Sequence, residues 1–87
     1  MEKPSKDEFI SFMQACIGTE LKKDIDEIKI NTSFHNLGLD SITSVLVMEK
    51  IENHFNVELN PIYFWDYPTI AEFVDFIFQE IMDHEKA

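Results

Sequence analysis

Residues 37–55 read LGLDSITSVLVMEKIENHF, a glycine-containing apolar loop followed by a long amphipathic segment. Four apolar side chains recur in that segment at the spacing of one helical face: Val45, Met48, Ile51 and Phe55. The spacing predicts a helix over residues 41–55 whose apolar stripe faces the core. On a wheel of about 100° per residue, Leu46 and Val47 fall outside the stripe. We therefore expect both side chains to be exposed near Ser41.

A first helix is predicted over residues 6–21, upstream of this stretch. Ser5 and Glu8 have the spacing of a capping box, in which each side chain accepts a hydrogen bond from the other residue's backbone N–H. Behind the cap, apolar side chains recur at helical spacing: Phe9, Met13, Cys16 and Ile17.

Between residues 22 and 40 the periodicity fades, and Asn, Thr, Ser and Gly collect. This composition predicts a long connecting loop. Four apolar side chains are expected to pin the loop to the core: Ile25, Ile28, Phe34 and Leu37. A loop of this length is unusual inside a compact domain, which indicates that it serves a purpose beyond connection.

Downstream, Asn60 and Pro61 are typical of the cap and first position of a short helical turn. Thr69 and Glu72 have capping-box spacing at the start of a last helix, whose tail over residues 83–87 is polar and expected to fray. The apolar face of that helix comprises Ile70, Phe73, Val74, Ile77, Phe78 and Ile81. The aromatic side chains of this region are assigned to core packing: Phe64, Trp65, Tyr67, Phe73, Phe76 and Phe78.

No segment shows strand alternation with hairpin turns, so the chain is predicted to be all-α. We expect a four-helix bundle with three main helices, one short helix and a long first loop. A chain of 87 residues is expected to form a single domain, 1–87.

The charge of the chain limits its partners. Seven Lys and no Arg face seventeen Asp and Glu, for a formal net charge of −10. Such a field repels phosphate backbones and anionic lipids, so we expect neither nucleic acid nor membrane partners. It favours encounter with basic surfaces on other proteins.

The single cysteine, Cys16, excludes an intrachain disulfide and indicates a buried core thiol in a reducing compartment. No run approaches the roughly 18 apolar residues of a membrane span, and a signal-peptide core is missing. We therefore predict a cytoplasmic location. His54 and His84 lack ligand partners at helical spacing, and the acidic residues at 24–27 lack the pattern of a calcium loop. No structural metal is expected.

Ser41, preceded by Asp40 at the start of a predicted helix, is the candidate residue for chemistry, and three interpretations of it remain open. In the first interpretation, the side chain of Ser41 or Asp40 caps the helix by accepting a hydrogen bond from a backbone N–H. In the second interpretation, Ser41 is a hydrolase nucleophile. Against it, Thr43 stands where the nucleophile-elbow motif needs glycine, and His35 is a single loop histidine without an evident partner to orient it as a base. In the third interpretation, Ser41 accepts a phosphate-linked group, because the free N–H groups at a helix start favour an anion.

The run over residues 37–55, followed by NPIYFWDYPTIAEFVDFI at 60–77, resembles the acyl carrier proteins. The resemblance covers nearly the whole chain and is closest to polyketide-synthase carriers, through Leu39-Asp40-Ser41 and Pro68-Thr69-Ile70. It implies that a phosphopantetheinyl transferase attaches 4′-phosphopantetheine from coenzyme A to Ser41, with Asp40 near the transferase's metal site. The modified chain, a phosphoprotein, then presents thioester-bound acyl intermediates to partner enzymes and has no catalytic activity of its own.

The same resemblance makes the helix after Ser41 the main recognition element. Together with the wheel positions of Leu46 and Val47 and the charge of Glu49, this makes these three the predicted docking residues. The partners that the resemblance implies are acyltransferases, ketosynthases or other enzymes of polyketide or fatty-acid biosynthesis. Some carriers of β-branching pathways have Trp where this chain has Val47, so that role is not predicted. We expect a monomer. The alternative function is a non-carrier acidic helical module for protein interaction, in which Ser41 is only a cap.

Overall fold

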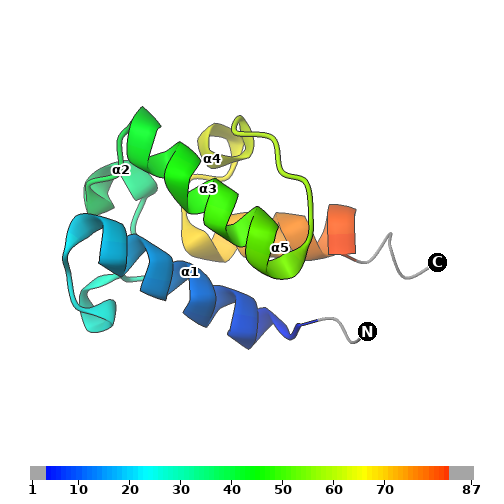
Figure 1. Cartoon of the computed structure of the whole chain (residues 1–87), viewed down its shortest axis with the longest axis horizontal. Helices are drawn as coiled ribbons and strands as arrows, with labels where there is room; N and C mark the ends of the chain where they lie inside the picture. Colours follow the sequence, from blue (N-terminus) through cyan, green and yellow to red (C-terminus); the bar gives the residue numbers. More distant parts are fainter. Residues whose placement is uncertain (1–3, 83–87) are drawn as a thin grey trace.

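The computed structural model describes residues 4–82, which form five α-helices around one apolar core (Figure 1). In chain order these are α1 (Lys6–Leu21), α2 (Phe34–Leu37), α3 (Ser41–Phe55), α4 (Tyr63–Asp66) and α5 (Ile70–Ile77). A 3-10 turn, η1 (Ile25–Glu27), follows α1, and a π-helical turn, η2 (Phe78–Met82), continues α5. The described residues contain no strand beyond one isolated bridge, and no helix among them is long and apolar enough to cross a membrane. The predicted all-α fold is confirmed.

The predicted capping box sets the start of α1. Ser5 Oγ accepts a hydrogen bond from the Glu8 backbone N–H at 3.1 Å, and Glu8 Oε1 accepts one from the Ser5 N–H at 2.8 Å. The helix ends at Leu21, because the next residue, Lys22, has a left-handed φ of 58° that breaks the helical path. Beside this end, a Cβ on Gly18 would lie 2.9 Å from the carbonyl oxygen of Lys23, so the tight turn requires glycine.

The core lies where α1 packs against α3 and α5, and Figure 1 shows α1 and α3 running side by side. The buried side chains that these three helices contribute include Phe9, Met13, Ile17, Val47, Met48, Ile51, Ile70, Phe73, Val74 and Ile77. Cys16 is buried as predicted. Burial raises the pKa of its thiol, an effect that outweighs the opposing charge of Lys50.

The segment predicted as a loop, residues 22–40, contains η1 and the short helix α2. Ser33 Oγ caps α2 by accepting a hydrogen bond from the Asn36 N–H at 3.0 Å, and Gly38 ends it at a φ of 111°. A single helical turn shows no periodicity, which is why the sequence predicted a loop here and not a helix. The prediction that Ile25 anchors this segment to the core is wrong, because its side chain is 46% exposed on η1.

Hydrogen bonds tie this segment to the connection between α4 and α5. The Phe34 N–H donates to the Pro68 carbonyl at 2.7 Å, and the Ala71 N–H donates to the Ile30 carbonyl at 3.0 Å. Together with the bridge between Ser33 and Thr69, they hold α2 against the start of α5. The segment is therefore a fixed part of the fold.

The bounds of α3 match the prediction, but the face it buries is rotated. Val47 is fully buried with Met48 and Ile51, whereas Val45 is exposed. Positions 47, 48 and 51 share one helical face, and it is this face that meets the core. The prediction that Val47 is an exposed docking residue is wrong, as is the inward placement of Val45. The centre of the stripe was set from spacing alone, and packing decides it.

The aromatic segment after Asn60 is also less buried than predicted. Asn60 caps the turn before α4, since its side-chain oxygen accepts the Ile62 N–H at 3.0 Å. Phe64 is buried, but Trp65 is 76% exposed, so its assignment to the core is wrong. Thr69 caps α5 through the Glu72 N–H. The predicted burial of the Ile81 side chain, the fraying of residues 83–87 and the surface position of His84 lie outside the described part of the chain.

Candidate functional site

The amino end of α3 is closed by Asp40. Its Oδ1 accepts hydrogen bonds from the Thr43 N–H and the Thr43 hydroxyl, each at 2.8 Å, while the Asp40 N–H donates to Thr43 Oγ1 at 2.9 Å. The backbone N–H of Thr43, followed by its hydroxyl, lowers the pKa of the Asp40 carboxyl below its ordinary value. The helix start therefore carries an ionised cap at neutral pH.

Ser41 is the first residue of α3, and Asp40 relieves it of any capping role. The Ser41 side chain is exposed, and its hydroxyl makes no hydrogen bond with any other described residue. Of the two residues proposed as the cap, Asp40 is the one that caps. The structure thus leaves a free hydroxyl at the amino end of a helix of 15 residues.

The loop before Ser41 is anchored on both sides of Gly38. Leu37 and Leu39 are buried in the core, so the left-handed glycine between them turns a chain that is fixed at both neighbours. Lys23 Nζ donates to the Leu37 carbonyl at 2.9 Å and connects this loop to the end of α1. These contacts fix the position from which the Ser41 side chain projects.

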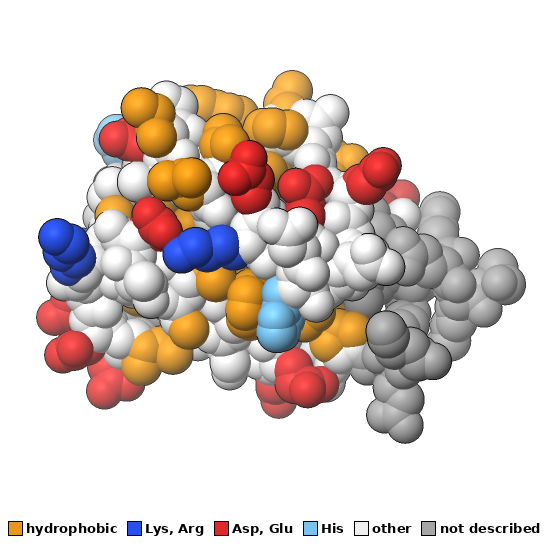
Figure 2. All heavy atoms as spheres, in the orientation of Figure 1, with side chains coloured by type: hydrophobic (Ala, Val, Ile, Leu, Met, Phe, Trp, Pro, Cys, Tyr) orange, Lys and Arg blue, Asp and Glu red, His pale blue; other side chains and the backbone are white. Residues whose placement is uncertain are grey.

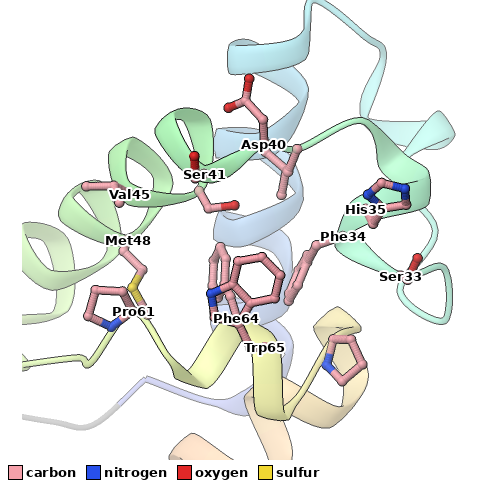
Figure 3. Close-up of a pocket in the computed structure, with 13 residues that line it drawn as sticks. Ser33, Phe34, His35, Asp40, Ser41, Val45, Met48, Pro61, Phe64 and Trp65 are labelled. Atoms are coloured by element: carbon pink, nitrogen blue, oxygen red, sulfur yellow. The ribbon is translucent and has the colours of Figure 1, made fainter.

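Ser41 stands at the edge of a cleft of about 320 Å³ between α2, the first half of α3, and α4 (Figure 3). Apolar and aromatic side chains form most of its wall: Phe34, Leu39, Val45, Met48, Pro61, Phe64, Trp65 and Pro68. The rings of Phe34 and Phe64 stack with centroids 4.4 Å apart. Polar groups at the cleft come from Ser33, His35, Asp40, Ser41 and Ser44. The sequence did not predict the walls of this cleft, because they come from two separate stretches, residues 33–48 and 61–68, that only the fold brings together.

His35 and Ser41 line the same cleft, but within residues 4–82 no hydrogen bond joins their side chains. The hydrolase interpretation needs a base that removes the serine proton and a third group that orients the base. No side chain in the described part of the chain hydrogen-bonds to the His35 ring. The arrangement therefore offers an available hydroxyl without an activating base.

The outer face of α3 carries exposed apolar and acidic side chains. Leu46 is 41% exposed and Ile42 is 71% exposed, and Glu49 is exposed one turn further along. The exposure predicted for Leu46 is confirmed. We call Ile42, Leu46 and Glu49 the α3 patch. Figure 2 shows apolar side chains and carboxylates interleaved over the region where α3 runs.

Two other predicted features concern metals. Residues 4–82 contain no group of three or more His, Cys, Asp or Glu side chains that would hold a metal ion. His54, predicted as a surface residue, is exposed and stacks on the Phe12 ring at a centroid distance of 4.0 Å. The imidazole therefore has a packing partner on α1.

Comparison with known proteins places this geometry in a family. Residues 11–77 match the family model described as "Phosphopantetheine attachment site", which covers the cleft, Asp40 and Ser41. A non-reducing polyketide synthase of Arthrinium sp. is 34% identical over 62 residues, or 71% of this chain. The chain spans only 3% of that synthase.

Two solved structures share the fold. A free-standing peptidyl carrier protein from Acinetobacter baumannii is 27% identical with a TM-score of 0.81, over 88% of this chain and 96% of that one. The HMG-ACPI domain of the CurA module from Lyngbya majuscula is 26% identical with a TM-score of 0.81, over 98% of this chain and 86% of that one. The resemblance noted in the sequence is confirmed.

Proposed function

The chain belongs to the phosphopantetheine attachment-site family of carrier domains, and from this premise we propose that Ser41 is the residue that carries the 4′-phosphopantetheine group. The family carries this prosthetic group, whose terminal thiol holds acyl groups as thioesters. The observation that supports Ser41 most strongly is its exposed hydroxyl, free of hydrogen bonds within residues 4–82, at the start of α3.

The residues around Ser41 suit a phosphate ester. The positive end of the α3 dipole lies at this position and favours the negative charge of a phosphate. The Asp40 carboxylate opposes that charge, and its Oδ1 is occupied by hydrogen bonds from the Thr43 N–H and hydroxyl. In the transferase complex, the same exposed carboxylate is available to the metal site that the family resemblance implies. Ser41 therefore serves as an anchor, and no catalytic role is assigned to it.

We propose that the carrier acts in polyketide biosynthesis, because a polyketide synthase is 34% identical to it over 71% of the chain. Its partners are then a phosphopantetheinyl transferase, which loads Ser41, and acyltransferases, ketosynthases or related enzymes, which act on the cargo. Carrier domains are non-catalytic parts of such enzyme systems, and this chain is proposed to act in the same way. Four further expectations stay predictions: a role in a fatty-acid pathway, a monomeric state, a single domain over residues 1–87 and a cytoplasmic location.

The α3 patch is the proposed docking surface. Ile42 and Leu46 offer apolar contact beside Ser41, and Glu49 adds negative charge for a basic partner surface. Charge raises the encounter rate while a small apolar contact keeps the affinity modest, which suits a carrier that must leave each enzyme quickly. Val47 is excluded from the patch, since its side chain is in the core.

Loading tests the proposal directly. The protein is incubated with coenzyme A and a promiscuous phosphopantetheinyl transferase, and intact mass is measured; the expected gain is about 340 Da, the mass of the transferred group. Ser41→Ala should show no gain. Ser44→Ala is the matched control, because Ser44 lines the same cleft three residues later and should load normally.

The alternative, an acidic interaction module in which residue 41 is only structural, predicts no gain of mass in any of these proteins. Loading that survives Ser41→Ala and disappears in Ser44→Ala would contradict the assignment. Circular dichroism of both variants shows whether a failure to load is a failure to fold.

A further inference from the structure

Three aromatic side chains form a cluster where α4 and the residue after it meet α5. Tyr67 stacks on Phe76 with ring centroids 4.3 Å apart and ring planes 16° apart. Tyr63 meets Phe76 edge-on at a centroid distance of 4.7 Å. All three rings pack against the core and are only half-buried. The cluster therefore leaves aromatic surface open to solvent, where a partner can contact it.

Carboxylates surround the stacked pair. Tyr67 and Phe76 line a shallow hollow of about 520 Å³ together with the acidic side chains of Glu72, Asp75 and Glu80. Ionised carboxylates gathered at one hollow repel one another, and a cation placed among them relieves this repulsion. The hollow shares no lining residue with the cleft beside Ser41, and none of its residues belongs to α3. It is therefore a surface separate from the α3 patch.

One cation of the chain is already seated at this hollow. Lys6 Nζ lies 2.9 Å from Asp75 Oδ1, and both side chains are at least half exposed. An exposed ion pair of this kind contributes little stability, so Lys6 is readily exchanged for another cation. Within residues 4–82, neither Glu72 nor Glu80 forms an ion pair. The hollow thus accepts a basic side chain and has carboxylates left for a second one.

Aromatic rings and carboxylates in one hollow favour arginine over lysine. A guanidinium group is planar, stacks on aromatic rings and donates paired hydrogen bonds to carboxylates, whereas an ammonium group is a compact and strongly hydrated charge. The chain contains no arginine, so a second copy of it cannot supply this group. Its net charge of −10 also opposes self-association. Charge and ring chemistry therefore point to a different protein as the partner.

We propose that the hollow over Tyr67 and Phe76 is a docking site for an arginine-bearing segment of a partner protein. The guanidinium group stacks on the ring pair, and the carboxylates of Glu72 and Glu80 accept its hydrogen bonds. The site requires no modification of Ser41 and goes beyond the carrier function. Because no residue of α3 lines it, a partner held here leaves Ser41 and the α3 patch open to an enzyme.

Two peptides of equal charge test the site. The unmodified, isotope-labelled protein is titrated at low salt with tri-arginine or tri-lysine, each acetylated and amidated, and amide shifts are followed by NMR. The largest shifts should fall on the residues of the hollow. Tri-arginine should bind about three-fold more tightly than tri-lysine, as expected for one exposed cation–π contact. Equal affinities would overturn the contact with the rings, and shifts centred on α3 or spread over the whole surface would overturn the hollow.

Substitutions separate the rings from the charges. Phe76→Leu should make the two peptides bind equally, while Phe12→Leu should keep the preference for arginine. Phe12 is the matched control, because it is also a half-buried ring but stacks on His54 and does not line the hollow. A preference that survives Phe76→Leu would refute the stacking.

Glu80→Gln, a surface change that leaves the rings in place, should weaken both peptides about two-fold. Glu27→Gln on η1 is its control and should have no effect. Equal weakening by both would show that total charge, not the hollow, binds the peptides. Ser41→Ala, which cannot be loaded, should bind tri-arginine like the natural protein. A failure to load Ser41 would therefore leave this inference standing, and a failure of the peptides to bind would leave the carrier function standing.

Discussion

The two ends of α3 are covered to very different degrees. At the carboxyl end, Phe55 stacks on Phe9 with ring centroids 4.4 Å apart, and His54 stacks on Phe12 at 4.0 Å. At the amino end, Ile42 is 71% exposed beside an open cleft. One helix thus secures the fold at one end and leaves the other available for attachment and docking. Stability and function are separated along about 20 Å of backbone.

The largest expected effect tests the packed end. Phe9 is fully buried and contacts the rings of Phe55 and Phe78, so Phe9→Ala should lower the free energy of unfolding by about 3–5 kcal/mol. Urea unfolding followed by circular dichroism measures it. Ile42→Ala at the open end should stay within about 0.5 kcal/mol of the natural protein. Similar losses in the two variants would remove the distinction between the ends.

Adjacent positions on α3 sharpen the comparison. Val47 is fully buried, and Val47→Ala should cost about 2 kcal/mol of unfolding free energy. Leu46→Ala should leave stability unchanged and raise the transferase KM for the carrier about five-fold, as expected for one contact of a small interface. Steady-state loading kinetics provide the second value. A higher KM in Val47→Ala than in Leu46→Ala, with both proteins folded, would return Val47 to the docking surface.

The cap at the open end is expected to give a smaller, pH-dependent effect. Because Thr43 lowers the pKa of Asp40 below its ordinary value of 3.8, the ionised cap contributes stability above that pH and loses it as the pH falls through the lowered pKa. Asp40→Asn keeps a capping side chain but does not titrate. Its unfolding free energy should therefore fall less steeply below about pH 4.

NMR titration of the Asp40 carboxyl carbon provides an independent test of this cap. Its midpoint should lie below 3.8 in the natural protein and move upward in Thr43→Val, which removes one hydrogen-bond donor. A midpoint at or above the ordinary value would mean that the cap bonds do not persist in solution.

The smallest expected effect concerns charge on the α3 patch. Glu49→Gln should raise the transferase KM about two-fold at low salt, and the difference should vanish near 1 M salt, where charges are screened beyond about 3 Å. Glu27→Gln is the control, because Glu27 lies on η1, on the other side of α1 from α3 in Figure 1. An equal effect of both substitutions would show that total charge, rather than the patch, sets the encounter rate.

The sequence predicted the long helices because their signals are local. Ser5 with Glu8 gave the start of α1, and the apolar stripe gave the bounds of α3. The short helix α2 was missed, since one helical turn has no period, and its cap Ser33 was recognised only in the structure. Ser41 and Asp40 were found through a motif, and which of them caps the helix needed the hydrogen bonds to Thr43.

Features that depend on packing between segments were beyond sequence reasoning. Val45 and Val47 are both valine on one helix, and only the position of the neighbouring helices buries one and exposes the other. Trp65 was assigned to the core because large aromatic side chains usually lie there. Its exposure follows from the shortness of α4, which buries Phe64 and leaves the next residue facing outward.

The buried thiol of Cys16 has a consequence for a domain that handles activated esters. A thiolate is the species that attacks a thioester, and burial keeps the pKa of this thiol high, so little thiolate forms at neutral pH. The chain's own sulfur is thereby prevented from intercepting the load it transports. Under the proposed function, the buried Cys16 thiol therefore competes poorly for the acyl group with the thiol at the end of the arm.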